Sequence, residues 1–237
     1  MTHEIIFELK NVTFNYSKTD PILKGVDLQI KHGKLIAIAG PNGCGKTTLV
    51  KLFNGLHKPA TGTILFKGRP IDKHEHLTEH VGIVFQNPDE QVFFPKVDED
   101  IAFGLRNLRV PEDEISKRLD NVLNTLKINK LRHKSFFNLS FGEKKKVAFA
   151  GVLVISPDII VLDEPTIGLD PWSRTQFFDL IIEMKKHSTL IVVTHDIELL
   201  KLVDEIHFLW GGVIKDTYTD FKEFERNMFS INPNEDD

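Results

Sequence analysis

Apolar and polar positions along the chain follow two patterns, one typical of strands and one typical of helices. Short apolar, β-prone segments predict strands at residues 5–16, 26–30, 34–39, 63–66, 81–85, 159–162, 190–193 and 206–210. Helical periodicity predicts helices at residues 47–53, within 97–128 with Pro111 at a helix start, at 140–154 and at 172–186. Strands that alternate with helices are typical of a parallel sheet. The pattern therefore predicts a parallel β/α core that a helical segment interrupts.

The helical segment sets the expected organisation of the chain. At 237 residues, the chain is long enough for one sizeable α/β domain, and it contains no internal repeat or low-complexity linker. We expect residues 1–85 and 156–220 to build the core and residues 86–155 to form a helical subdomain. Residues 221–237 are expected to form a C-terminal tail that frays from residue 232.

A glycine-rich segment joins a predicted strand to a predicted helix and fits the pattern G-x-x-x-x-G-K-[ST]. Glycines let the backbone wrap closely around phosphates, so that its N–H groups and the helix N-terminus face the anion. Lys46 would reach the β- and γ-phosphates, and the Thr47 hydroxyl would bind Mg²⁺. The strand–loop–helix context favours a nucleotide site over a chance glycine turn. The predicted nucleotide-binding residues of this loop are Gly40, Pro41, Asn42, Gly43, Cys44, Gly45, Lys46, Thr47 and Thr48.

Two carboxylates complete the predicted nucleotide site. The apolar run at residues 159–162 is followed directly by Asp163 and Glu164. Ligands of open α/β sheets bind at the carboxyl ends of the strands. Asp163 can therefore hold Mg²⁺, directly or through water, and Glu164 is the candidate to polarise an attacking water. Carboxylates that merely end a strand are the less favoured alternative beside a phosphate loop.

Composition narrows the class of protein. A formal net charge of −4 argues against an electrostatic nucleic-acid binder. The single cysteine, Cys44, excludes an intrachain disulfide and fits a reducing compartment. Beside Lys46 and a helix N-terminus, its thiol is expected to be activated. We expect neither a secretory signal nor an apolar run near the ~20 residues of a membrane span, hence a cytoplasmic protein that is soluble or peripheral to a membrane.

With both halves of a nucleotide site present, the chain resembles the ATP-binding subunits of ABC transporters along nearly its whole length. Leu139-Ser-Phe-Gly-Glu143 resembles the family signature, and Gly168-Leu-Asp170 resembles the D-loop. Gln86, His195 and Tyr16 stand at the places of the Q-loop glutamine, the switch histidine and the aromatic residue that stacks on adenine. A lone histidine after a strand is more often structural, so the order and spacing of all the motifs carry the resemblance.

The resemblance implies a P-loop NTPase fold of the ABC type, with a parallel β/α core, an antiparallel N-terminal β part and a helical insertion. It implies an ATPase whose catalytic residues are Glu164, His195 and Gln86 and whose Mg²⁺ ligands are Thr47, Gln86 and Asp163. It also implies that Ser140 and Gly142 of a second chain, together with Asp170, close the nucleotide site from the other face. One phosphate loop and one signature per chain therefore predict an ATP-dependent homodimer, or a heterodimer with a related ATPase.

Two signature positions depart from the family pattern. Phe141 stands where glycine is usual, and a positive φ or a close backbone approach there would be strained. Glu143 replaces the commoner glutamine and adds a negative charge near the nucleotide edge. We expect these departures to leave nucleotide binding intact and to bear only on the details of the contact made in the second chain's site.

The region after Gln86 points to a subfamily. Residues 85–91 and 97–104 resemble the energy-coupling-factor ATPases and the related cobalt and nickel uptake ATPases. This resemblance implies a contact here with an integral membrane subunit of a transporter. Phe93 and Phe94 could form the floor of an apolar groove for that contact, or could equally be ordinary core residues. The chain ends soon after the core, without a long C-terminal dimerisation extension, which favours a metal-type or biotin-type member.

Three histidines, His74, His76 and His80, invite a metal-site interpretation, since His76 and His80 could share a helix face. A solvated polar connection is the favoured reading because no second cluster completes a site.

We therefore expect an ATPase that binds Mg²⁺ and ATP at the cytoplasmic face of the membrane and powers import of a small substrate. Cobalt or nickel is the first choice and a vitamin such as biotin the second. The main alternative is a soluble ABC ATPase of iron–sulfur assembly or translation. A catalytically silent adaptor is disfavoured by the presence of Glu164 and His195.

Overall fold

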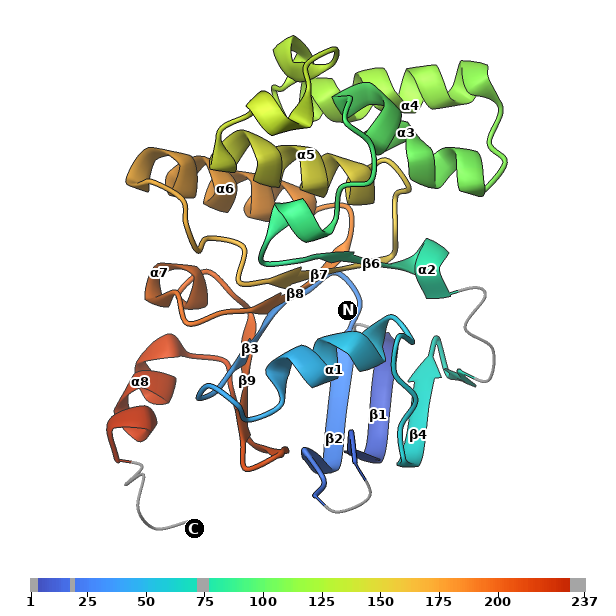
Figure 1. The fold of residues 1–237 in the computed structure, drawn as a ribbon. Coiled ribbons are helices and arrows are strands. Elements are labelled where there is room, and N and C mark those ends of the chain that lie inside the picture. Colours follow the sequence, from blue (N-terminus) through green and yellow to red (C-terminus); the bar gives the residue numbers. More distant parts are fainter. Residues whose placement is uncertain (1–3, 18–19, 72–76, 231–237) are drawn as a thin grey trace.

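Two β-sheets organise the chain in the computed structural model, which describes residues 4–17, 20–71 and 77–230 (Figure 1). The first sheet is antiparallel, with the order β2-β1-β4-β5. Its strands are β1 (Ile5–Phe14), β2 (Leu23–Lys31), β4 (Thr61–Phe66) and β5 (Arg69–Pro70). The second sheet has the order β10-β9-β3-β8-β7-β6 and is parallel except for β10. Its strands are β3 (Leu35–Ala39), β6 (Val81–Val84), β7 (Ile159–Asp163), β8 (Thr189–Val193), β9 (Glu205–Trp210) and β10 (Val213–Tyr218).

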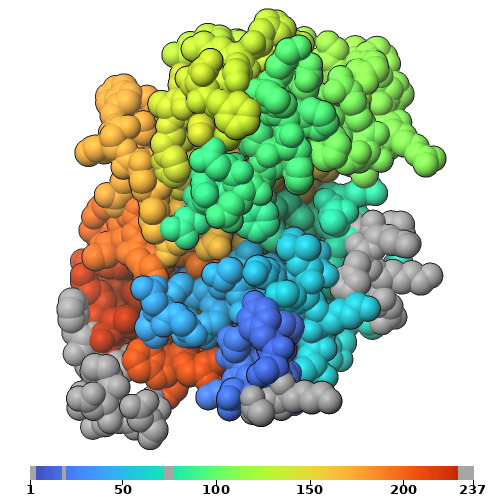
Figure 2. Space-filling view, in the orientation of Figure 1, coloured from blue at the N-terminus to red at the C-terminus, as the bar shows by residue number. Residues whose placement is uncertain are grey.

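Helices cover both faces of the parallel sheet. They are α1 (Lys46–Phe53), α2 (Leu77–His80), α3 (Val97–Asn107), α4 (Glu112–Thr125), α5 (Phe141–Leu153), α6 (Pro171–Met184), α7 (Ile197–Leu200) and α8 (Phe221–Ser230), with 3₁₀ turns η2 (Pro88–Glu90), η3 (Asn129–Leu131) and η4 (Phe136–Asn138). Figure 1 shows α3, α4 and α5 at one end of the molecule, with the antiparallel sheet at the other and α1 near the middle. In the space-filling view, the green and yellow residues of the helical insertion form a layer over the blue and cyan core (Figure 2).

Strand β3 divides the hydrophobic core into two clusters. All five of its residues are buried. Leu35, Ala37 and Ala39 face the cluster that includes α3 to α6, whereas Ile36 and Ile38 face the cluster of α1 and the antiparallel sheet. Successive side chains of a strand point to opposite faces, so an apolar run without alternation is what a strand covered on both sides requires.

The helical insertion leaves the parallel sheet after its edge strand, β6, and returns at the neighbouring strand, β7. Helix α5 packs tightly on β6, because a Cβ atom at Gly82 would lie 2.3 Å from Cγ1 of Val152. Only a glycine at this position permits the observed approach of helix and strand.

The structure confirms the predicted fold class, and it corrects some elements. The helical stretch expected within residues 97–128 is two helices, and the second begins directly after Pro111, at the predicted helix start. Between them the chain turns at residues 108–111, where Arg109 adopts a positive φ of 57°. Strands β5 and β10 and helices α2, α7 and α8 were not predicted. The segment expected to be a C-terminal tail begins with α8, whose buried Phe224 contacts Phe208 and Tyr218. Its expected frayed end, residues 232–237, lies outside the described residues.

No helix in the described part of the chain is long and apolar enough to cross a membrane. The division into a core, a helical subdomain and a tail remains a prediction.

Candidate functional site

Four adjacent parallel strands bring the predicted site residues to one edge of the sheet. The register pairs Asp163 of β7 with Val193 of β8, and Val193 with Ile38 of β3, so these strands end side by side. The segments that follow β6, β7, β8 and β3 carry Gln86, Glu164, His195 and the glycine-rich loop. They enclose a cavity of about 250 Å³ that is lined by Ile22, Asn42, Gly43, Gly45, Lys46, Thr47, Thr48, Gln86, Asp163, Glu164, Val193 and His195.

The glycine-rich loop turns directly into α1. Gly45 is the N-cap of this helix, with a φ of 108°, and a Cβ atom there would lie 2.8 Å from Cδ2 of Leu23. Both the backbone angle and the contact require glycine. The buried Lys46 donates hydrogen bonds from Nζ to the carbonyl oxygens of Gly40 and Pro41, at 2.8 and 2.9 Å. Its ammonium group therefore lies along the loop, at the cavity wall.

Cys44 differs from the expectation for a reactive thiol. The residue is buried and joins the hydrophobic cluster of α1, and its side chain does not line the cavity. Burial raises the pKa of the Cys44 thiol, and the opposing charge of Lys46 does not reverse this shift. The prediction of an activated thiol was wrong, because desolvation outweighs the neighbouring cation. The backbone of Cys44 remains part of the loop.

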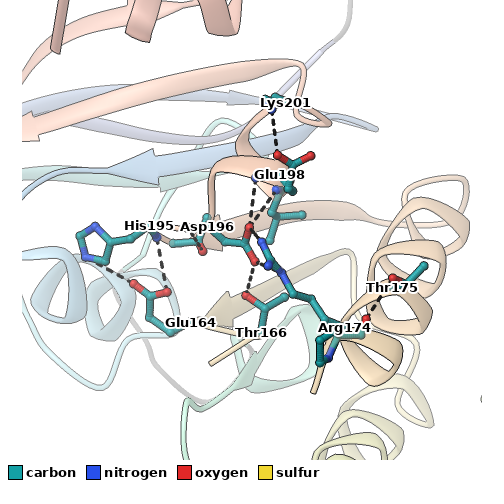
Figure 3. Close-up of polar contacts among 11 residues, drawn as sticks. Glu164, Thr166, Arg174, Thr175, His195, Asp196, Glu198 and Lys201 are labelled. Atoms are coloured by element: carbon teal, nitrogen blue, oxygen red, sulfur yellow. Dashed lines mark hydrogen bonds and ion pairs between the residues drawn. The ribbon is translucent and has the colours of Figure 1, made fainter. Parts of the chain in front are cut away.

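The two carboxylates at the end of β7 occupy different environments. Burial raises the pKa of Asp163, and the neighbouring charge of Glu164 raises it further. Glu164 is buried and adopts a φ of 45°, a left-handed backbone conformation that is uncommon for a residue other than glycine. Its Oε1 lies 3.5 Å from Nε2 of His195, and its Oε2 lies 3.4 Å from the His195 backbone nitrogen. Glu164 and His195 therefore face each other across the cavity edge (Figure 3).

The donor set of the cavity suits a hard cation held together with phosphates. Thr47, Gln86 and Asp163, which carry a hydroxyl, an amide and a carboxylate, line the same cavity as Lys46. Mg²⁺ prefers oxygen ligands and is usually held by one or two carboxylates together with substrate phosphates. No group of three or more His, Cys, Asp or Glu side chains among the described residues could hold a metal ion by itself. The residues present therefore fit Mg²⁺ that arrives with a nucleotide.

Asp196 anchors the segment between β8 and α7 that carries His195, and the sequence did not identify it as a site residue. Its carboxylate accepts hydrogen bonds from Thr166 Oγ1, at 2.7 Å, and from Nε of Arg174, at 2.8 Å, and it pairs with the second guanidinium nitrogen of Arg174 (Figure 3). Asp196 also caps α7 by accepting from the backbone N–H groups of Glu198 and Leu199. An aspartate before a helix is an N-cap signal that the sequence does contain. Its partners on other elements have no local signal.

The signature residues lie away from this chain's own cavity. Neither Ser140 nor Gly142 is among the described lining residues. Ser140 is the N-cap of α5 and forms a capping box with Glu143, in which the Ser140 backbone N–H donates to the Glu143 carboxylate at 3.0 Å. This hydrogen bond is the main cause of the lowered pKa of Glu143. The negative charge of Glu143 is therefore used to cap a helix within its own chain.

Phe141 does not adopt the positive φ that would be strained at this position. It begins α5 and is absent from the described residues with positive φ. Its ring lies against Gly168, where a Cβ atom would be 2.6 Å from the ring carbon Cε1. Asp170 follows Gly168 and caps α6, accepting from the backbone N–H groups of Trp172 and Ser173 at 3.0 Å each. Roles for Ser140, Gly142 and Asp170 toward a nucleotide remain predictions.

Tyr16 lies beside the phosphate loop rather than in the cavity. The side chain is 58% exposed, and its hydroxyl lies 3.4 Å from Thr48 Oγ1 and 3.3 Å from Nε2 of His57. His57 stacks on Phe14, with ring centroids 4.8 Å apart. An exposed aromatic face next to the loop is suited to stacking on a base. His57 was not identified from the sequence, since nothing local to it indicates a site.

The histidines between β5 and β6 provide no metal site in the described residues. His80 pairs through Nδ1 with Asp158, at 2.5 Å, and Lys67 pairs with the same carboxylate at 3.0 Å. His80 thus joins the end of α2 to the segment before β7. His74 and His76 lie outside the described residues.

The glycine loop at a helix N-terminus, with two carboxylates at the neighbouring strand end, defines the class of P-loop nucleotide-binding proteins. Comparisons with known proteins agree with this class. The model of the family described as ABC transporter matches residues 23–167. EcfA2 of Clostridium perfringens, an energy-coupling factor transporter ATP-binding protein, is 46% identical over 205 residues, which are 84% of this chain and 72% of the relative. EcfA of Methanocaldococcus jannaschii is 41% identical over 215 residues, which are 88% of this chain and 77% of the relative.

Solved structures give the same result. The structure of cbiO1 from Clostridium perfringens, described as part of the ABC transporter complex cbiONQ, matches with a TM-score of 0.86 and 41% identity, over 95% of this chain and 93% of that one. A dimeric post-hydrolysis state of the ATP-binding cassette MJ0796, bound to ADP and Pi, matches with a TM-score of 0.80 and 26% identity, over 90% and 98%. The chain belongs to the ABC transporter family and is an ATP-binding, ATP-hydrolysing subunit of the energy-coupling-factor type.

Proposed function

We propose that this ATPase binds Mg²⁺ and ATP between two chains at the cytoplasmic face of the membrane and drives a membrane partner to import a small substrate. The observation that carries the proposal is the convergence of Lys46, Asp163, Glu164 and His195 on one cavity. One chain thereby supplies a cation to bind the phosphates, a carboxylate to hold the metal ion and a second carboxylate to polarise the attacking water.

Each residue has a distinct task in the proposed mechanism. Lys46 exchanges its loop carbonyl partners for phosphate oxygens, and the N–H groups at the start of α1 face the same oxygens. Glu164 orients the attacking water. His195, whose Nε2 lies 3.5 Å from the Glu164 carboxylate, keeps that carboxylate in its orientation. Mg²⁺ bound at Thr47, Asp163 and Gln86 would neutralise the charge that develops on the phosphates.

A second chain is required because the signature does not reach its own cavity. A γ-phosphate in transfer needs donors on all sides. Ser140 and Gly142 stand at the N-terminus of α5, where backbone N–H groups favour an anion. In the proposed dimer, these residues close the partner's site, as Asp170 does from the start of α6. The dimeric state described for the MJ0796 cassette supports this arrangement.

An aromatic surface, formed by the exposed Phe93 and Phe94 over the partly buried Phe103, is the proposed dock for the membrane partner. Phe93 is 74% exposed and Phe94 is 38% exposed, and their ring centroids lie 5.5 and 5.2 Å from that of Phe103. This exposure removes the alternative that Phe93 and Phe94 are core residues. Both backbone N–H groups donate to Asp100, at 2.8 and 3.0 Å, so the segment is held in place. Large exposed apolar patches are typical of protein–protein contacts.

The transported substrate is proposed from likeness alone. Cobalt or nickel is the first choice, because residues 85–91 and 97–104 resemble the cobalt and nickel uptake ATPases. A vitamin such as biotin is the second. No described residue of this chain is assigned to the substrate, since the ATPase subunit need not touch it.

Purification of the tagged chain from its native host tests the proposal. We expect an integral membrane protein to be recovered with the chain, and detergent-solubilised complex to hydrolyse ATP. Uptake of radioactive nickel or cobalt by cells, compared with uptake of biotin, should depend on an intact Lys46. Recovery of a soluble iron–sulfur or ribosomal assembly without any membrane protein would favour the non-transport alternative instead.

A further inference from the structure

Lys145 is a fully enclosed cation on the signature helix. It lies in the first half of α5, and only 2% of its surface is exposed. Burying an ammonium group is costly unless hydrogen bonds compensate for the lost water. Lys146, the next residue, extends its ammonium group to Gln176 on α6 and is less enclosed. A lysine that serves only to fill space would be replaced at lower cost by an apolar side chain of similar size.

The partners of Lys145 lie at the end of β7. Its Nζ donates to the carbonyl oxygen of Glu164, at 3.1 Å, and to that of Pro165, at 2.9 Å. The two hydrogen bonds therefore reach the peptide groups on the two sides of Pro165. Burial lowers the pKa of Lys145 to about 8, while the charges of Glu164 and Asp163 oppose this shift.

The backbone that Lys145 holds is the strained part of the site. Glu164 has a φ of 45°, and such conformations cost about 1–3 kcal/mol and persist only where the surroundings fix them. On one side, the Glu164 N–H donates to the carbonyl of Val193, at 2.8 Å. On the other side, Lys145 binds the Glu164 carbonyl. The direction of the Glu164 carboxylate depends on this backbone conformation.

Lys145 also touches the residue that departs from the usual signature. Its Nζ lies 5.4 Å from the centre of the Phe141 ring, which in turn lies against Gly168. A cation above an aromatic face is stabilised by the ring quadrupole. Phe141 thus covers Lys145 and links the start of α5 to the D-loop, on the side that the proposed dimer would present to the partner's nucleotide.

We propose that Lys145 is a positioning residue that fixes the backbone of Glu164 and thereby couples the signature helix to this chain's own hydrolytic carboxylate. The inference rests on the proposed role of Glu164 in orienting water. Lys145 touches neither substrate nor metal and acts only through Glu164.

Steady-state ATPase kinetics of the full-length chain, with equilibrium ATP titration and melting temperature, test the inference. We expect Lys145→Met to lower kcat at least tenfold and to leave ATP affinity within about twofold, because the two carbonyls lose their donor. Lys145→Gln keeps an N–H donor and should recover most of the lost kcat. Lys146→Met, from the neighbouring position, is the control and should remain near wild type.

A double-mutant cycle of Lys145→Met and Glu164→Gln distinguishes failure of this inference from failure of the proposed function. If Lys145 acts through Glu164, adding Lys145→Met to Glu164→Gln should not lower the residual turnover further. An equal loss in both backgrounds would overturn the inference, as would a kcat of Lys145→Met within twofold of wild type. Glu164→Gln with near-normal turnover would instead refute the proposed role of Glu164, and the inference with it.

The test also holds if Lys145→Met does not fold. Lys145→Asn is then compared with Lys145→Gln, since both are neutral amides but asparagine is one methylene too short to match the reach of glutamine. A lower kcat for Asn at equal melting temperature supports the positioning role. Equal kcat values for the two variants, or a parallel loss of kcat, ATP affinity and melting temperature in both, would show a structural role only and overturn the inference.

Discussion

Glu164 combines three properties at the scale of a single residue: burial, a left-handed backbone and a carboxylate facing His195. Replacing it by glutamine keeps the shape and removes the charge that polarises water. We therefore expect Glu164→Gln to retain ATP binding while turnover falls by on the order of 10²–10⁴-fold, the usual contribution of a general base. ATP titration and phosphate release measure the two effects. Turnover within a few-fold of wild type would remove Glu164 from the mechanism.

Cys44 provides a second test at the residue scale. Because burial raises the pKa of its thiol, little reactive thiolate forms near neutral pH. We expect a maleimide to label the native chain at pH 7.5 at least tenfold more slowly than the chain unfolded in urea. Mass spectrometry of timed samples gives both rates. Equal rates would mean that the thiol reaches solvent in the folded protein.

Site residues could be predicted from the sequence where their immediate neighbours in the chain form a recognisable pattern. The glycine loop, Asp163 and Glu164 each follow an apolar strand, and the structure brings them to one cavity as predicted. Asp196 and Lys145 were missed because their partners are remote in sequence. Arg174 is 22 positions before Asp196, and Glu164 is 19 positions after Lys145. Side chains become partners there only through packing of different elements.

At the scale of elements, periodicity predicted the long helices and buried strands but failed for short or half-exposed ones. Strand β10 has exposed residues in the middle of its length, and α7 is a single turn held by the Asp196 cap. The helix is too short, and the strand too polar in its middle, to define a period. Burial of Phe93 and Phe94 could not be decided from the sequence either, because an aromatic pair has the same pattern in a core and on a docking surface.

Helix α5 offers a test of its capping box. Glu143→Ala removes the acceptor for the Ser140 backbone N–H and should lower the free energy of unfolding by about 0.5–2 kcal/mol. Glu143→Gln preserves a capping box and is the matched control, expected to stay close to wild type. Urea denaturation of the three proteins at neutral pH measures the difference. A similar loss in both variants would assign the effect to charge rather than to the cap.

Strand β9 carries a buried histidine that should make stability depend on pH. Burial lowers the pKa of His207 to about 4, and its Nδ1 bonds Thr217 Oγ1 at 2.9 Å, while Glu205 lies 3.7 Å from Nε2, beyond hydrogen-bond distance. Between pH 6.5 and 4, His207 is protonated in the unfolded chain but remains neutral in the folded one. The free energy of unfolding is therefore highest above pH 6.5 and decreases as the pH falls through this range. The loss approaches about 3 kcal/mol near pH 4.

The His207 prediction is checked by urea denaturation of wild type and His207→Gln at pH 7 and at pH 4.5. We expect the difference in unfolding free energy between the two pH values to be smaller in the variant by about 2 kcal/mol or more. Parallel pH profiles for the two proteins would show that His207 takes up a proton equally in both states.

At the scale of the whole molecule, coupling should be separable from hydrolysis. Changing Phe93 and Phe94 to Ser removes exposed rings, so we expect basal ATPase activity and melting temperature near wild type, with loss of the co-purifying membrane partner. Phe149→Ser, at a fully buried position, is the control and should cost about 3–5 kcal/mol and lower activity with stability. A stable, active double variant that still holds its partner would move the dock elsewhere.

The insertion between β6 and β7 has a mechanical consequence. The chain leaves the sheet after Val84 and returns at Ile159, and the register pairs Val84 with Leu162. At about 3.3 Å per residue, the two attachments lie roughly 10 Å apart, along the direction of the strands. The two attachments define an axis about which the helical layer could rotate. Gln86 lies two residues after Val84, next to one end of this axis. The close packing of Val152 on Gly82 would limit this rotation. We therefore expect that any movement of Gln86 on nucleotide binding turns the surface that carries Phe93 by a small angle.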